Sequence, residues 1–119
     1  MGIPRKYRLT SGRLFGEVYK RGKMLKSPLF VVYYLPIEDG PKIGIVVSKK
    51  FGKAVRRNRL KRQIREIVRG HLPHLQDAVV ILPRMKVKDV SFQEMKHVLD
   101  NMLEQVGRGD SSEVSEYSK

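Results

Sequence analysis

Near the start of the chain, apolar residues recur at intervals of three and four positions. They predict a first helix over about residues 12–20. Thr10 or Ser11 can cap this helix, because either hydroxyl can accept a hydrogen bond from an amide of the first turn. Gly22 is expected to end it.

Strand-like patterns follow. Two runs rich in β-branched and aromatic residues predict strands over 29–35 and 43–47. Turn-forming residues fill the stretch between them, so we interpret the pair as a hairpin. A shorter strand is predicted over 24–27. A continuous apolar run over 78–82 is typical of a strand that is buried on both faces, which places it near the centre of the sheet.

Two further helices are predicted. The first starts between positions 53 and 57 and runs to Arg69, because Gly70 and then Pro73 supply stop signals. The second begins at Ser91, where a glutamate three positions later completes a capping box. Its sheet-facing side is expected to present Phe92, Met95, Val98, Leu99, Met102, Leu103 and Val106.

Together these elements predict an α+β fold. Three helices flank a small mixed central sheet of about four strands, in the order αβββαβα. A chain of 119 residues suits one core, so we expect a single domain over 1–106. Residues 107–119 have almost nothing apolar to bury and are expected to form a disordered polar tail.

The charge is strongly positive and unevenly distributed. The formal net charge is +13, and residues 1–72 hold 19 Lys and Arg against 4 Asp and Glu, whereas residues 73–119 hold 6 against 8. Such an excess favours a polyanionic partner, because lysine and arginine displace the counterions that condense on phosphates. We therefore predict a nucleic-acid-binding protein whose contacts lie in the first part of the chain.

Other classes of function find little support in the composition. The chain has no cysteine, which excludes disulfides and suits a reducing compartment. Neither a signal peptide nor a membrane span is apparent, so we expect a cytoplasmic protein without a membrane partner. The acids are too few and too scattered to form a catalytic or metal-binding cluster, so we expect no catalytic residues in the protein and no tightly bound metal. The three histidines are expected to be exposed and structural.

The predicted basic helix carries most of the candidate chemistry. Between Lys49 and Arg69 there are ten Lys and Arg and one acid. Apolar residues at i, i+4, i+7 and i+8 from Leu60 form a stripe for the core, and arginines lie opposite it. The sheet needs that stripe, which argues against a membrane-surface helix. Arg57 falls near the stripe, so either its side chain leaves past the sheet edge or the helix begins there.

Aromatic residues form a second candidate surface. Phe15 and Tyr19 share one face of the first helix, and side chains alternate along the strand 29–35. Either Phe30 and Tyr34 or Tyr33 can therefore face a groove, and the sequence leaves this choice open. Aromatic rings stack on unpaired bases, although a core role suits each residue equally well.

The run from Gly44 to Glu66, with Arg57, Asn58 and Arg59 at its centre, resembles the signature region of the bacterial ribonuclease P protein family. The similarity covers about residues 5–105. It implies a left-handed βαβ crossover, which the general preference for right-handed crossovers would disfavour. It also implies an RNA catalyst that removes the 5′ leader of precursor tRNA, with Mg²⁺ held mainly by RNA.

The resemblance further implies two RNA surfaces, with ribonuclease P RNA and precursor tRNA as partners and no obligate protein partner. The residues implied for the catalytic RNA are Lys50, Lys53, Arg56, Arg57, Asn58, Arg59, Lys61, Arg62, Arg65 and Arg69. Those implied for the leader are Phe15, Tyr19, Val31 and Tyr33. Two positions depart from the family pattern, which often has Phe at Tyr19 and Asn at Lys53.

Two alternatives compete with this assignment. A ribosomal-type protein or general RNA chaperone would bind structured RNA without a role in cleavage, and it would not distinguish precursor from mature tRNA. A DNA-binding repressor is less well supported, because no helix-turn-helix spacing leads into the basic helix.

Overall fold

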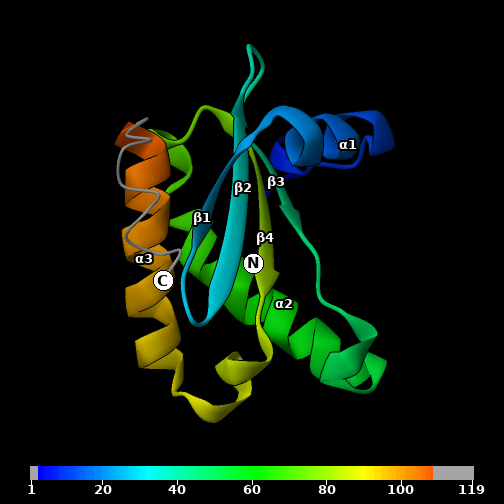
Figure 1. Ribbon diagram of the computed structural model, residues 1–119, viewed down its shortest axis with the longest axis vertical. Coiled ribbons are helices and arrows are strands. Elements are labelled where there is room, and N and C mark those ends of the chain that lie inside the picture. The colour runs from blue at the N-terminus through cyan, green and yellow to red at the C-terminus, as the bar shows by residue number, and fades with distance from the viewer. Residues whose placement is uncertain (1–2, 109–119) are drawn as a thin grey trace.

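A computed structural model describes residues 3–108, which form three α-helices and one four-stranded sheet (Figure 1). The elements are α1 (Gly12–Arg21), β1 (Lys23–Lys26), β2 (Phe30–Pro36), β3 (Lys42–Ile45), α2 (Ala54–Arg69), β4 (Asp77–Pro83) and α3 (Phe92–Arg108). The predicted α+β class and element order are confirmed. No helix within residues 3–108 is long and apolar enough to cross a bilayer.

Hydroxyl caps begin two of the helices. Ser11 Oγ accepts a hydrogen bond from the Leu14 amide at 3.1 Å, so Ser11 rather than Thr10 caps α1. Ser91 Oγ accepts one from the Glu94 amide at 3.1 Å at the start of α3. At its other end α3 continues through residue 108, two residues into the stretch for which we expected a disordered tail. The rest of that stretch, 109–119, lies outside the described residues.

The strand order corrects one prediction. The sheet runs β1-β2-β4-β3, with β2 antiparallel to β4 and β3 parallel to it. The expected hairpin between 29–35 and 43–47 is therefore wrong, because β4 lies between these two strands. The apolar side chains of β4 are buried on both faces, apart from the half-exposed Leu82. A central position gives this strand a hydrogen-bonded neighbour on each side as well.

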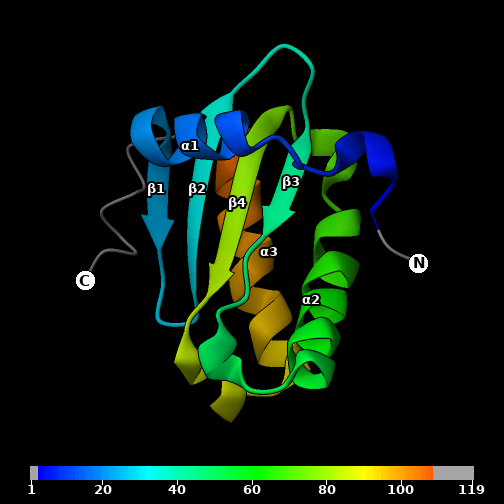
Figure 2. The same cartoon turned by 90° about the vertical axis from the view of Figure 1, so that its right-hand side faces the viewer.

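β3, α2 and β4 form a βαβ unit. α2 packs on the sheet face that α3 also covers, since both helices contribute to the same core cluster. Figure 2 looks at the opposite face, where β3 and β4 run downward and β4 lies to the left of β3. The crossover is therefore left-handed, as the family resemblance implies, although almost all such units are right-handed.

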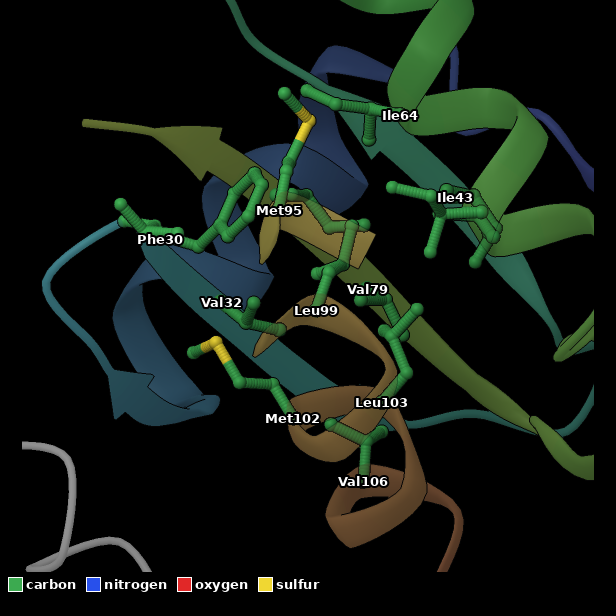
Figure 3. Close-up of a cluster of buried hydrophobic side chains, with 14 of the residues drawn as sticks. Phe30, Val32, Ile43, Ile64, Val79, Met95, Leu99, Met102, Leu103 and Val106 are labelled. Carbon is green, nitrogen blue, oxygen red and sulfur yellow. The ribbon is translucent and has the colours of Figure 1, made fainter. Parts of the chain in front are cut away.

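The main core lies between the sheet and the pair of helices α2 and α3. Figure 3 shows Phe30, Val32 and Val79 of the sheet turned toward the side chains of α3. The apolar stripe of α2 is buried as predicted, through Leu60, Ile64, Ile67 and Val68. A smaller cluster on the other face places Val18 of α1 against Ala78 and Val80 of β4. α1 is the helix on this second face, and Leu9 and Ile37 also belong to its cluster. Figure 2 shows α1 crossing only one end of the strands.

A polar contact joins the end of α2 to α3. His71 Nε2 lies 2.6 Å from Asp100 Oδ1, and Lys96 Nζ donates to Asp100 Oδ2 at 2.8 Å. We expected exposed histidines, which is wrong for His71, since its side chain is only 11% exposed. Burial raises the pKa of Asp100. The hydrogen bonds and positive charge of Lys96 and His71 outweigh that effect, so the pKa lies below its ordinary value.

Asp100→Asn is expected to lower the free energy of unfolding at pH 7 by about 1–2 kcal/mol, because it removes a charged hydrogen-bond acceptor. The folded-state pKa is depressed, so this stabilisation is present above the unfolded-state value near pH 4. It is lost as the pH falls through the folded-state value. Urea unfolding of both proteins at decreasing pH measures the difference, and a difference that does not shrink below about pH 4 would contradict the role of the carboxylate charge.

Candidate nucleic-acid interface

A turn ahead of α2 determines where this helix begins. Ser48 Oγ accepts a hydrogen bond from the Lys50 amide at 3.1 Å and caps the 3-10 turn Lys49–Phe51. The side chain of Phe51, the last residue of this turn, is buried. Gly52 then adopts a φ of 110°, a left-handed conformation that glycine takes without strain. The helix starts at Ala54, and the lysines of the turn remain exposed beside its first residues.

Arg57 lies inside the first turn of α2 and does not begin the helix. Its Nε donates to the Gly52 carbonyl oxygen at 3.2 Å, so the side chain folds back toward the turn. It remains half-exposed and outside the core. The structure thus decides between the two positions that the sequence allowed for this arginine.

The cations of α2 and of the preceding turn are accessible to a partner. We call the ten residues predicted for the catalytic RNA the α2 cation surface. Seven are exposed (Lys50, Lys53, Arg56, Asn58, Arg59, Arg62 and Arg69) and three are half-exposed (Arg57, Lys61 and Arg65). Arg69 pairs with Glu66 at 3.4 Å, whereas the ion pairs found within residues 3–108 involve none of the other nine. This charge is available for phosphates.

The second predicted surface also comes together, on the sheet face that α1 covers. We call Phe15, Tyr19, Val31 and Tyr33 the aromatic face. The ring centroids of Phe15 and Tyr19 lie 6.5 Å apart, and those of Tyr19 and Tyr33 lie 5.0 Å apart with the two rings nearly perpendicular. Tyr19 is 42% exposed and the other three are half-buried.

The fold also assigns the aromatic residues that the sequence left open. Phe30 and Tyr34 are buried on the opposite face of β2, in the main core. Tyr33 belongs to the aromatic face. Burial, and then the neighbouring Tyr33, raise the pKa of Tyr19 above its ordinary value, so the phenol stays neutral near pH 7.

A small depression connects the two surfaces. It has a volume of about 170 Å³, and its lining includes Phe15 of the aromatic face, Ile45 of β3, and Lys61 and Arg65 of α2. In Figure 2, α1 crosses the strands and α2 stands beside β3. An RNA strand that leaves the aromatic rings toward α2 therefore meets Lys61 and Arg65, and Arg8 lines the same depression.

Sequence reasoning missed two residues of this face, Gly44 and Leu82. Leu82 lies opposite Val31 in the β2–β4 pairing and is half-exposed, packed against the cluster that includes Val18 of α1. Gly44 lies in β3 under the Phe15 ring. An isolated glycine within a strand pattern often marks a close approach, and this was the available signal.

Gly44→Ala is expected to lower the free energy of unfolding by about 1–3 kcal/mol through overpacking. A Cβ atom at this position would lie 2.6 Å from Phe15 Cζ and 3.3 Å from Leu9 Cδ2, so the Phe15 ring must move. Urea unfolding measures the change. Gly16→Ala is the matched control, since its Cβ meets nothing within 4 Å and alanine favours the helix. Equal stability of Gly44→Ala and the parent protein would contradict the close packing.

Comparison with known proteins identifies related chains. The family model for Ribonuclease P matches residues 3–107. The ribonuclease P protein component of Thermotoga maritima is 40% identical over 110 residues, covering 86% of this chain and 93% of the relative. That of Geobacillus sp. (strain WCH70) is 37% identical over 109 residues, covering 88% and 94%.

Solved structures agree with the sequence relatives. The ribonuclease P protein from Thermotoga maritima matches with a TM-score of 0.72 at 36% identity, covering 82% of this chain and 96% of that one. The Staphylococcus aureus ribonuclease P protein matches with a TM-score of 0.75 at 33% identity, covering 82% and 93%. The similarity therefore extends over most of the length of these proteins.

Proposed function

Because this chain belongs to the ribonuclease P protein family, we propose that its two surfaces hold two different RNAs. The α2 cation surface binds the catalytic RNA, and the aromatic face holds the single-stranded 5′ leader of precursor tRNA. Ribonuclease P is an endoribonuclease of tRNA 5′ processing, and this chain is its protein component and not its catalyst.

The observation that best supports this proposal is that the aromatic face and the cations of α2 border the same depression. Unpaired bases stack on aromatic rings, which contributes about 1–3 kcal/mol per base, whereas a duplex hides its base faces. Lys61 and Arg65 of the α2 cation surface border the same depression as Phe15, so a catalytic RNA bound to α2 and a leader stacked on the aromatic face would lie side by side here. The exposed arginines on the remaining sides of α2 suit the phosphate backbone of a folded RNA.

We also propose that RNA holds most of the Mg²⁺ of the assembled enzyme. Mg²⁺ prefers carboxylate oxygens and water, and no three His, Cys, Asp or Glu side chains gather within residues 3–108. The described residues do not fit a magnesium site. The cations of α2 instead reduce the repulsion between two RNAs, which lowers the concentration of Mg²⁺ needed for their association.

An RNA partner follows from membership of the family. We propose precursor tRNA as the second ligand and the cytoplasm as the location. The lack of cysteine supports this location, because a chain without thiols suits a reducing compartment.

A cleavage assay at low Mg²⁺ tests the proposal, with a bacterial ribonuclease P RNA alone compared with the same RNA plus this protein. We expect a large gain in cleavage at the mature 5′ end, and no cleavage by the protein alone. The assembled enzyme should also bind precursor tRNA more tightly than mature tRNA. Equal affinity for the two, with RNA binding intact, would favour a general RNA chaperone and contradict the role of the aromatic face.

A further inference from the structure

A groove between α2 and the segment that leads into α3 lies apart from the aromatic face. Its inner part has a volume of about 410 Å³ and its outer part about 500 Å³, and Arg59, Gln63 and Phe92 line both. Each volume lies within the range of ligand pockets, roughly 300–1,000 Å³. We call this feature the α2–α3 groove.

The floor of the groove is apolar and its rim is cationic. Buried side chains of Leu60, Val87 and Met95 line the inner part. Arg56 and Arg59 of α2 and Lys88 of the 3-10 turn Met85–Asp89 are exposed around it. None of these three cations takes part in an ion pair found within residues 3–108. The groove therefore combines an apolar pocket with positive charge that has no acidic partner there.

Two further side chains give the groove the properties of a base-binding site. Phe92 is the first residue of α3, is half-buried, and borders both parts of the groove. Its ring provides an aromatic surface for stacking. Gln63 is half-exposed on α2, and its amide can both donate to and accept from a base edge. Glu66 lines the outer part, where it is paired with Arg69 at 3.4 Å.

We propose that the α2–α3 groove takes one unpaired base of the catalytic RNA. Phe92 stacks on this base, Gln63 contacts its edge, and the three rim cations hold the adjoining phosphates. The catalytic RNA is the source, because the groove opens beside α3, whereas the aromatic face for the leader belongs to the sheet face covered by α1. This inference rests on the proposed function, since it assumes the same RNA partner.

The charge of the rim favours RNA over an apolar protein segment. An apolar occupant would leave Arg56, Arg59 and Lys88 without counter-charge, while a nucleotide supplies both a flat apolar face and phosphates. A leader base in the groove, or no base at all, remains an outcome that the following experiment separates from the proposal.

The test measures affinity for a bacterial ribonuclease P RNA, without tRNA, over a series of salt concentrations. Phe92→Leu keeps apolar volume and removes the aromatic face, so we expect binding to weaken about 5- to 150-fold with an unchanged salt slope. Lys88→Ala should reduce the slope of log affinity against log salt by about 0.7–0.9. Lys96→Ala is the control on α3 outside the groove, and it should bind like the parent protein.

Chemical probing of the RNA with a base-reactive reagent identifies the occupant. One unpaired base should be protected by the parent protein and reactive with Phe92→Leu. Gln63→Ala should expose the same base, and this second variant decides the matter if Phe92→Leu does not fold. Parent-like affinity and protection for both variants, or a protected base in the precursor leader, would overturn the proposal.

The same preparations distinguish this inference from the proposed function. If the parent protein supports cleavage and prefers precursor tRNA while the Phe92 and Gln63 variants bind RNA normally, only the groove assignment fails. If the parent protein gives no gain in cleavage and does not bind the RNA, the proposed function fails, and the groove assignment fails with it.

Discussion

Replacing Arg62 and Arg65 together by alanine is expected to weaken binding of the catalytic RNA about 30-fold at a fixed salt concentration. Each side chain is expected to contribute about 1 kcal/mol through hydrogen bonds to phosphate, and about 2 kcal/mol corresponds to this ratio. The slope of log affinity against log salt should shrink by about 1.4–1.8, because each phosphate contact contributes about 0.7–0.9. Filter binding over a salt series measures both quantities.

A second pair of arginines provides the matched control for charge. Arg13 and Arg21 of α1 have side chains that are 90% and 69% exposed, and each lies 3.8 Å from Glu17. Replacing both by alanine also removes two positive charges, but from a surface outside α2. We expect a salt slope close to that of the parent protein. Equal losses for the two pairs would show that net charge, and not its placement on α2, controls the affinity.

The helices could be predicted from the sequence because their signals are local. The hydroxyls of Ser11 and Ser91 act on amides three residues away, and the stripe that begins at Leu60 depends on spacing within one helix. The strand order depends instead on contacts between distant segments. β4 lies between β2 and β3, and its apolar residues are mostly buried. The sequence of residues 29–47 contains no feature that predicts a third strand between β2 and β3.

The candidate site was predictable to a similar extent. Charge density and helical spacing indicated which side of α2 faces solvent, and alternation along β2 limited the aromatic residues to two sets. The choice of Tyr33 over Tyr34 required the position of α1, which only the fold supplies. Phe92 packs against the main core, as predicted for the sheet-facing side of the last helix, but it is only half-buried and also borders the α2–α3 groove. The hydrophobic periodicity of α3 predicts which side of this helix is apolar. It does not predict which residues on that side are left partly exposed next to α2.

Tyr19→Ala is expected to weaken binding of precursor tRNA by the assembled enzyme about 5- to 150-fold and to leave binding of mature tRNA unchanged. Tyr19 is 42% exposed, and its ring lies nearly perpendicular to that of Tyr33 at a centroid distance of 5.0 Å, so its exposed part can stack on a leader base. Loss of one stacked base corresponds to about 1–3 kcal/mol. Because the ring is exposed, its removal should cost little stability, unlike removal of Phe15, which packs on Gly44.

Tyr19→Phe separates stacking from hydrogen bonding. Burial and then Tyr33 raise the pKa of Tyr19, so its hydroxyl is neutral in the assay and carries no charge that phosphates would repel. A phenylalanine keeps the ring, and we expect affinity close to that of the parent protein. If Tyr19→Phe binds as weakly as Tyr19→Ala, the hydroxyl and not the ring holds the RNA. If mature tRNA loses affinity in parallel with precursor tRNA, the contact lies outside the leader, and the aromatic face cannot be its binding site.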